Sequence, residues 1–314
     1  MSRTTAPLLL LLLCAPCWLG CGDETASQDV LPSTDILAPP DSGPPPPGDV
    51  HETGMDSAAE DTVLDLPDIG APPSGSEGCG KSPIGLTTTL DIQGKARTFE
   101  VSVPSDYDPE TPYPLVFAFH GLGGGGPLAQ LYFGLKFSAE GAAIVVYPSA
   151  LPLANFGGQT GWDLFPSGDD FAFFDAMHAH LMTELCVDAT RVFATGHSFG
   201  GYMTNALGCH RADVLNAIAP VAGGPPSFGT CKGPIAAWIT HGSADNTVPL
   251  SEGTKTRDTW LNMNGCESAA SAISPSPCVA HAGCVRDVHW CEHPGGHDWP
   301  SFAGTAIWNF FSSQ

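Results

Sequence analysis

The fold of this chain is decided by the stretch Val192-Phe193-Ala194-Thr195-Gly196-His197-Ser198-Phe199-Gly200-Gly201-Tyr202-Met203. A short apolar run ends in Gly-His-Ser-Phe-Gly, and the residues after it are typical of a helix. This G-x-S-x-G pattern between a strand and a helix predicts a sharp turn that holds the Ser198 hydroxyl clear of the backbone. We therefore predict that Ser198 is a nucleophile, and that the N-terminus of the helix beside it stabilises a developing negative charge.

Short apolar strands alternate with helices along most of the chain. Strands are expected at 86–91, 97–103, 115–119, 143–147, 192–195, 217–222, 235–240 and 285–290, and helices at 128–140, 171–185, 201–207, 252–263 and 303–311. Several strands are continuous apolar runs, as in strands buried on both faces. This order predicts an α/β fold, with a mostly parallel central sheet and helices on both faces.

Two further polar residues are expected to act together with Ser198. Asp245 follows the strand at 235–240, and His297 stands near the C-terminus. Loops at the carboxyl ends of parallel strands build the site in such sheets. The order Ser198, Asp245, His297 is that of the α/β-hydrolase fold, which is therefore the predicted architecture. His297 is expected to take the Ser198 proton and return it to a leaving alcohol, while Asp245 orients the imidazole.

Other residues compete for these roles. Asp298 adjoins His297 too closely in sequence to orient its ring easily, so Asp245 is preferred. His120 and His241 end strands and are expected to brace loops by hydrogen bonds. Two backbone N–H groups are expected to form the oxyanion hole, because such holes stabilise the charge of the intermediate. One belongs to Phe199, directly after the nucleophile, and the other to Leu122, in the turn after the strand at 115–119.

The N-terminal part of the chain has two regions of different composition. Residues 1–21 combine Arg3 with a short apolar run and read as a signal peptide. Leu19-Gly20-Cys21 resembles the end of a bacterial lipobox, although Trp18 departs from that pattern, and it favours a lipid anchor at Cys21 over a freely secreted product. Residues 22–78 are rich in proline and contain no aromatic residue, so we expect a disordered acidic linker before a catalytic domain at 79–314.

Charge and cysteine content narrow the possible partners and compartment. The formal net charge is −22, which makes nucleic acid an improbable partner, and the protein is expected to be a monomer. Eight cysteines follow the signal region, and in an exported chain they suggest four disulfides with 105 possible pairings. A zinc site formed by Cys278, Cys284 and Cys291 is the alternative, but it lacks the close C-x-x-C spacing.

Several motifs together resemble the carbohydrate esterase family 1 feruloyl esterases and the polyhydroxybutyrate depolymerase-like proteins. The resemblance covers about residue 79 to the C-terminus, and the matching stretches are Gly78-Cys79-Gly80-Lys81, Phe119-His120-Gly121-Leu122-Gly123-Gly124, Leu185-Cys186-Val187-Asp188, Cys209-His210-Arg211-Ala212-Asp213, Asn264-Gly265-Cys266 and Gly295-Gly296-His297. It implies a secreted serine esterase acting on plant cell-wall polysaccharide, with Ser198, Asp245 and His297 as its catalytic triad. It implies no metal and no organic cofactor.

The substrate class leaves alternatives. A polyhydroxybutyrate depolymerase and an acetyl-xylan esterase stay open within the esterases, as does an inactive surface-tethered carbohydrate-binding protein. A ferulate ester would need an apolar slot beside Ser198, and flat rings pack well on aromatic walls. Phe199 neighbours Ser198, Trp299 lies two residues after His297, and Trp162 is expected in a loop at the same face. We therefore predict Trp162 and Trp299 as substrate-binding residues and expect a preference for feruloyl esters.

Overall fold

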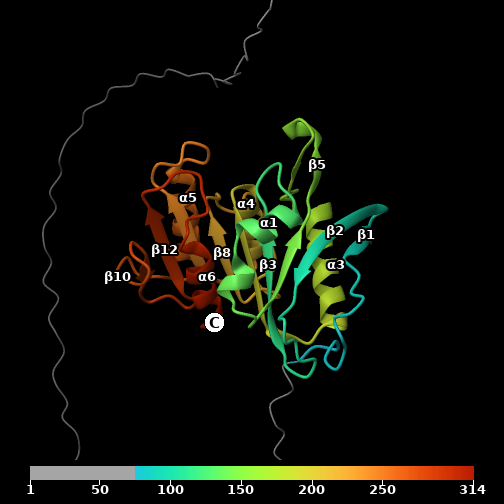
Figure 1. Ribbon diagram of the computed structural model, residues 1–314. Coiled ribbons are helices and arrows are strands. Elements are labelled where there is room, and N and C mark those ends of the chain that lie inside the picture. The colour runs from blue at the N-terminus through green and yellow to red at the C-terminus, as the bar shows by residue number, and fades with distance from the viewer. Residues whose placement is uncertain (1–74) are drawn as a thin grey trace, which may run out of the picture. The chain divides into compact units, whose positions relative to one another are not determined.

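A computed structural model describes residues 75–314. The predicted signal peptide, Cys21 and most of the predicted linker lie outside the described residues. The described part is built on a ten-stranded sheet with the order β1-β2-β4-β3-β7-β8-β9-β12-β11-β10 (Figure 1). The strands from β4 to β12 in that order run parallel, and the strands at both edges pair antiparallel. Their bounds are β1 Thr89–Ile92, β2 Lys95–Ser102, β3 Tyr113–Phe119, β4 Ile144–Pro148, β7 Val187–His197, β8 Ala217–Val221, β9 Ala236–Gly242, β10 Ala270–Ala272, β11 Val279–His281 and β12 Val288–His293.

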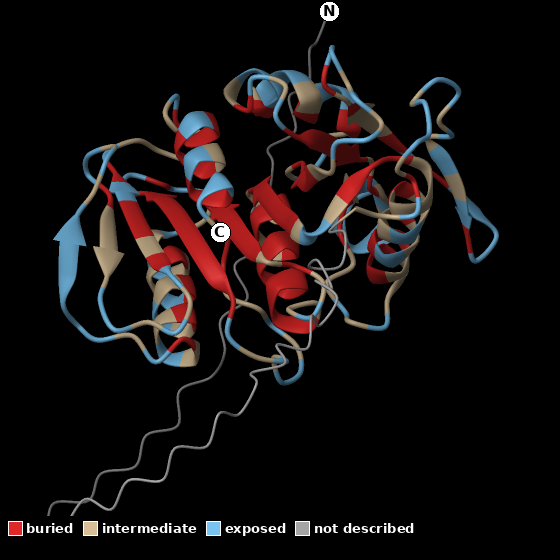
Figure 2. Ribbon diagram, turned by 90° about the horizontal axis from the view of Figure 1, so that it is seen from below, coloured by how far each residue is buried: buried red, intermediate tan, exposed pale blue. Residues whose placement is uncertain are grey.

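Helices cover both faces of this sheet and enclose a separate apolar core on each. On one face lie α1 (Gly126–Tyr132), α2 (Leu135–Ser138) and α6 (Ala303–Ser312). On the other lie α3 (Asp169–Glu184), α4 (Phe199–His210) and α5 (Leu250–Met263). The central strands are buried between the two layers, as Figure 2 shows, which explains their continuous apolar runs. The predicted α/β-hydrolase fold is confirmed.

The structure differs from the predicted elements in three places. The helix expected at 128–140 is interrupted, because Gly134 adopts a left-handed conformation with φ of 63° between α1 and α2. The loop after β4 contains a hairpin of β5 (Leu151–Leu153) and β6 (Gln159–Gly161), with a 3-10 turn between them. Strands β10 and β11 were not predicted, because each has only three residues and neither has a buried side.

All eight cysteines of the folded part form disulfides. The pairs are Cys79–Cys186, Cys209–Cys231, Cys266–Cys284 and Cys278–Cys291. The prediction of four disulfides is confirmed. The alternative of a zinc site at Cys278, Cys284 and Cys291 is excluded, because each of these sulfurs is bonded to another cysteine.

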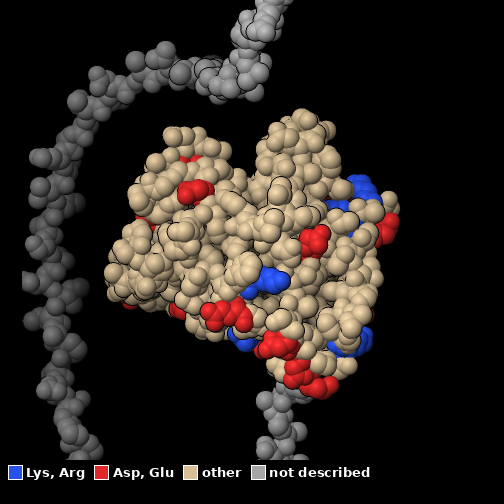
Figure 3. All heavy atoms as spheres, viewed as in Figure 1, with Lys and Arg blue, Asp and Glu red and all other residues tan. Residues whose placement is uncertain are grey.

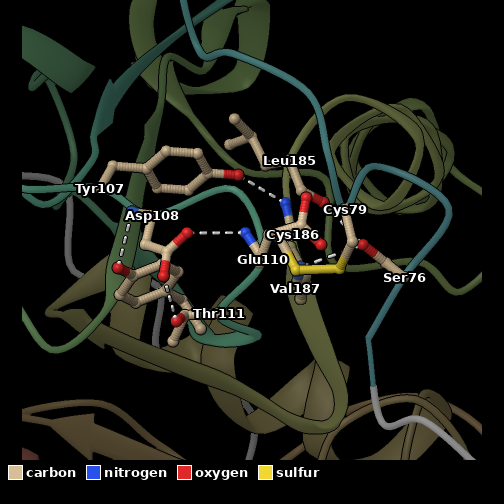
Figure 4. Close-up of a disulfide and its surroundings, with 10 residues drawn as sticks. Ser76, Cys79, Tyr107, Asp108, Glu110, Thr111, Leu185, Cys186 and Val187 are labelled. Carbon is tan, nitrogen blue, oxygen red and sulfur yellow. Dashed lines mark hydrogen bonds between the residues drawn. A yellow bond between two sulfur atoms is a disulfide. The ribbon is translucent and has the colours of Figure 1, made fainter.

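The first described residues are linked to the start of β7 by hydrogen bonds and a disulfide (Figure 4). The Ser76 N–H donates to the Val187 carbonyl at 2.9 Å, and its hydroxyl donates to the Leu185 carbonyl at 2.6 Å. Three residues later, Cys79 is bonded to Cys186. Residues 75–78, which the sequence analysis assigned to the linker, therefore contact the folded domain. Sequence pattern gave no signal for this, because backbone groups and a small hydroxyl make the contacts.

Charged side chains are unevenly distributed over the surface of the folded part. On the face shown in Figure 3, they gather mainly along the lower and right edges, whereas the upper part carries few of them. Within residues 75–314, no helix is both long and apolar enough to cross a membrane.

Candidate active site

Ser198 stands on a strained turn between β7 and α4. Its backbone has φ of 58° and ψ of −120°, a conformation that costs energy for a residue with a side chain. The Ser198 N–H donates to the Val221 carbonyl on β8 at 2.9 Å, which holds the turn in place. A Cβ at Gly200 would lie 1.9 Å from the Phe119 carbonyl oxygen, so only glycine fits there. The strand and helix therefore close tightly and project the hydroxyl beyond the sheet.

His297 connects Ser198 to Asp245. Nε2 of His297 lies 2.8 Å from the Ser198 Oγ, and its Nδ1 lies 2.7 Å from Oδ2 of Asp245. With the Nδ1–H donated to the carboxylate, Nε2 can accept the hydroxyl hydrogen of Ser198. The three residues follow the carboxyl ends of β7, β9 and β12, of which β9 and β12 are adjacent while β8 separates β7 from β9. Asp298, the competing acid, is exposed to solvent.

The environment of Asp245 keeps it ionised. Its other oxygen accepts the backbone N–H groups of Thr247 and Val248 at 2.8 and 2.9 Å. Burial acts to raise the pKa of Asp245, but the hydrogen bonds from His297, Val248 and Thr247 outweigh it and hold the pKa below its usual value. An ionised carboxylate fixed in this way can orient the imidazole and stabilise its cation.

Two backbone N–H groups near the Ser198 turn have no hydrogen-bond acceptor within residues 75–314. Phe199 is the first residue of α4, where backbone N–H groups have no partner within the helix. Within the part of the chain that the structure describes, the Leu122 N–H donates to no acceptor either. Gly121 lies against Ser198, since a Cβ built on it would be 3.3 Å from the Ser198 Cβ. The arrangement can therefore offer two donors to an oxyanion.

The loop that carries Leu122 is braced by His120, as the sequence predicted. The Ala150 N–H donates to Nε2 of His120 at 3.0 Å, so the ring hydrogen sits on Nδ1 and is donated to the Gly121 carbonyl at 2.7 Å. Burial lowers the pKa of His120, which keeps this tautomer neutral. His241 has the same kind of role, because its Nε2 bonds to the Val248 carbonyl at 2.9 Å in the Asp245 loop.

Known proteins resemble this chain over most of its folded part. Residues 168–224, which contain Ser198, match the prolyl oligopeptidase family (Peptidase S9). Feruloyl esterase D of Neurospora crassa is 34% identical over 273 residues, which cover 76% of this chain and 90% of that protein. Feruloyl esterase C of Emericella nidulans is 35% identical over 256 residues, with 75% and 90% covered. This chain belongs to the feruloyl esterase C and D family.

Family membership makes the protein a carboxylic ester hydrolase and confirms the resemblance drawn from the sequence motifs. The solved acetyl xylan esterase from Aspergillus awamori shares the fold of this esterase, with a TM-score of 0.60. It is 17% identical, and the match covers 73% of this chain and 98% of that one. At this identity the likeness concerns the fold alone.

Trp162 is largely buried in this esterase, and the surface that it keeps lies in a cleft that Phe199 also lines. Its side chain is only 2% exposed, and its indole N–H donates to the His120 carbonyl at 2.8 Å. The ring also packs edge-on against Phe119 at 5.1 Å. Trp162 thus supports the loop that carries Leu122, and its role as a substrate-binding residue stays a prediction.

Trp299 lies on another side of the site from Phe199. Its ring packs on Phe133 of the loop after α1 at 4.4 Å, and its backbone N–H donates to the Tyr132 hydroxyl at 3.0 Å. Phe199 instead packs on Phe156, with centroids 5.2 Å apart. Trp162 and Phe199 line one cleft, whereas Trp299 is not part of its lining. Tyr132 also lies 3.5 Å from His197, a contact that no sequence motif signalled.

Proposed function

We propose that this esterase hydrolyses feruloyl and related hydroxycinnamoyl esters of plant cell-wall polysaccharide. The relatives named feruloyl esterase C and D support this substrate class, since the chain covers 90% of their length. The observation that carries the proposal is the series of hydrogen bonds from Ser198 through His297 to Asp245. Such a series makes a serine hydroxyl nucleophilic at neutral pH.

The proposed reaction has two stages. Ser198 Oγ attacks the ester carbonyl while His297 Nε2 takes its proton, and the resulting imidazolium is stabilised by Asp245. His297 then gives that proton to the leaving alcohol oxygen, which leaves a feruloyl-serine ester. A water molecule, deprotonated by His297, cleaves this ester and releases ferulate, and Ser198 recovers its proton.

The negative oxygen of each tetrahedral intermediate is held by the Phe199 and Leu122 N–H groups in this proposal. The two donors are backbone groups of braced segments, so they need no reorganisation when charge develops. The N-terminus of α4 adds the positive end of a helix dipole at the same place.

A substrate panel with the Ser198→Ala variant tests the proposal. Wild-type protein should release ferulate from methyl ferulate and from feruloylated arabinoxylan fragments, and faster than it cleaves acetyl-xylan or polyhydroxybutyrate. Ser198→Ala should lower kcat on the order of 10⁴–10⁶-fold with unchanged thermal stability. Near-normal activity of the variant would rule out Ser198 as nucleophile. Cleavage of acetyl-xylan or the polyester with no release of ferulate would assign the protein to that other substrate class.

Export is the second part of the proposal. Residues 1–21 have the composition of a signal peptide, and the four disulfides require an oxidising compartment. We propose a secreted or cell-surface enzyme that is attached through lipid on Cys21. Mass spectrometry of the N-terminal peptide from a bacterial host should find diacylglycerol on Cys21, and an unmodified or uncleaved N-terminus would contradict the anchor.

A further inference from the structure

Two hollows of different character flank Ser198. The first, called here the aromatic cleft, has a volume of about 740 Å³ and includes Phe156, Phe165, Phe199 and Phe228 in its lining. The second, called the α1 hollow, has about 440 Å³ and is lined by residues of α1 and the loop before it, among them Gly121, Leu122, Leu128, Leu131 and Tyr132. Neither lining includes Ser198 itself. Phe199 of the aromatic cleft follows Ser198 in the chain, and Gly121 of the α1 hollow lies against the Ser198 side chain, so both hollows lie close to the nucleophile.

The position of His297 distinguishes the two hollows. A leaving alcohol must lie within hydrogen-bond reach of Nε2 of His297, because that nitrogen returns the proton. The His297 ring packs against the His197 ring at 4.9 Å, and His197 in turn packs against Tyr132 at 5.6 Å. Tyr132 lines the α1 hollow and not the aromatic cleft. His297 therefore approaches Ser198 from the side of the α1 hollow.

We propose that the aromatic cleft binds the acyl group of the ester and that the α1 hollow receives the alcohol. This inference rests on the feruloyl esterase activity proposed above and adds which residues select the acid. With the alcohol oxygen directed to His297 and the carbonyl oxygen to the Phe199 and Leu122 N–H groups, the acyl chain is left to extend on the Phe199 side.

The walls of the aromatic cleft suit a flat ring. Phe156 and Phe199 pack with centroids 5.2 Å apart, and Phe165 and Phe228 stack at 4.0 Å with planes 25° apart. Phe199 can occupy this position because Gly161 lacks a side chain, since a Cβ there would lie 2.6 Å from the Phe199 ring. Planar aromatic groups gain stacking energy on such surfaces that an acetyl group cannot.

The lining of the cleft also includes polar groups. Lys95 forms an ion pair with Asp169, and the buried Arg97 pairs with Asp170 at 2.5 Å. Arg97 is 1% exposed and is closed to a ligand, whereas the Lys95 and Asp169 side chains are 55% and 29% exposed and can meet one. The hydroxyl and methoxy groups of a hydroxycinnamoyl ring can hydrogen-bond to such groups, whereas a purely aliphatic acid cannot. The cleft thus matches a ring that is apolar on its faces and polar at its rim.

Four esters test the assignment by varying the acid and the alcohol separately: methyl ferulate, methyl acetate, a feruloylated arabinoxylan oligosaccharide and an acetylated xylan oligosaccharide. Phe156→Ala removes a 39% exposed side chain, so the fold should persist, and Phe228→Ala is a second variant of the same wall. In each variant, kcat/KM for each feruloyl ester should fall about tenfold relative to its acetyl counterpart, methyl compared with methyl and oligosaccharide with oligosaccharide. The loss should be the same for methyl and oligosaccharide esters.

Two further variants serve as controls. Leu131→Ala, in the α1 hollow, should lower kcat/KM only for the oligosaccharide esters, whichever acid they carry. Phe137→Ala removes an equally apolar exposed ring that lines neither hollow and should change none of the four ratios. A loss in Phe156→Ala that follows the alcohol rather than the acid would overturn the assignment. Wild-type protein that cleaves acetates but neither feruloyl ester would instead refute the proposed function, and with it this inference.

Discussion

Removal of the Cys79–Cys186 disulfide should destabilise the domain more than removal of any bridge near the C-terminus. The two cysteines are separated by 107 residues, whereas Cys278 and Cys291 are separated by 13. A crosslink restricts the unfolded chain more when it closes a longer loop. Loops of these lengths correspond to about 4.8 and about 2.9 kcal/mol at 25 °C, a difference of ~1.9 kcal/mol in the free energy of unfolding.

Burial of the cysteines predicts the opposite order, which makes the comparison informative. Cys278 and Cys291 are 1% and 0% exposed, whereas Cys79 is only partly buried. A packing cost would therefore be greater for the C-terminal pair. The hydrogen bonds around Cys186, such as the one from its N–H to the Tyr107 hydroxyl at 2.7 Å, do not require the bridge (Figure 4).

Urea unfolding of two double variants measures the difference. Cys79→Ala/Cys186→Ala should lose more free energy of unfolding than Cys278→Ala/Cys291→Ala, with similar m-values in both. An equal or larger loss for the C-terminal pair would refute the loop-entropy argument. A changed m-value in one variant would place its effect in the unfolded state or in partial unfolding.

Three other measurements test separate parts of the structure. Asp245→Asn should lower kcat/KM for ester hydrolysis by several orders of magnitude, whereas Asp298→Asn should lower it little, because Asp245 hydrogen-bonds to the His297 ring. The reverse ranking would reject Asp245 as the orienting acid. Burial and the nearby His297 lower the pKa of His197 to about 3, so between that value and pH 6.5 the unfolded state binds a proton that the folded state does not. The free energy of unfolding should therefore fall by ~1.4 kcal/mol per pH unit below about 6.5 on account of this residue, and an unchanged pH slope in His197→Asn would contradict it. Protein that starts at residue 75 should melt at a higher temperature than protein that starts at residue 79, because only the longer protein keeps the Ser76 hydrogen bonds to Leu185 and Val187. Identical melting temperatures would show that these bonds contribute nothing to thermal stability.

The meeting of Ser198, Asp245 and His297 could be predicted from sequence because it depends on topology. Each residue follows a strand of the parallel part of the sheet, and those strands, β7, β9 and β12, end on the same edge. Apolar runs and their order were enough to place the three loops together. The bracing role of His120 followed from the same kind of position, at the end of β3.

The N-terminal boundary and the short edge strands could not be predicted in this way. Ser76 is held by hydrogen bonds to Leu185 and Val187, more than a hundred residues further along the chain. Polar backbone pairing of this kind leaves no periodic pattern of apolar residues. The three-residue strands β10 and β11 could not be predicted from the sequence for the same reason.

The aromatic residues show why proximity in sequence does not determine a binding surface. Trp299 is two residues from His297, yet its ring faces Phe133, more than 150 residues earlier in the chain. Trp162 lies in a loop at the correct edge of the sheet, yet its ring turns inward to the His120 carbonyl. The aromatic cleft is formed by Phe156, Phe165, Phe199 and Phe228, which come from separate segments that only the folded chain brings together. A position after the carboxyl end of a strand therefore predicts nearness to the nucleophile, whereas the direction of each ring depends on the partner against which it packs. The selectivity for the acid of the ester should follow the rings of the aromatic cleft rather than the residues closest to the triad in sequence.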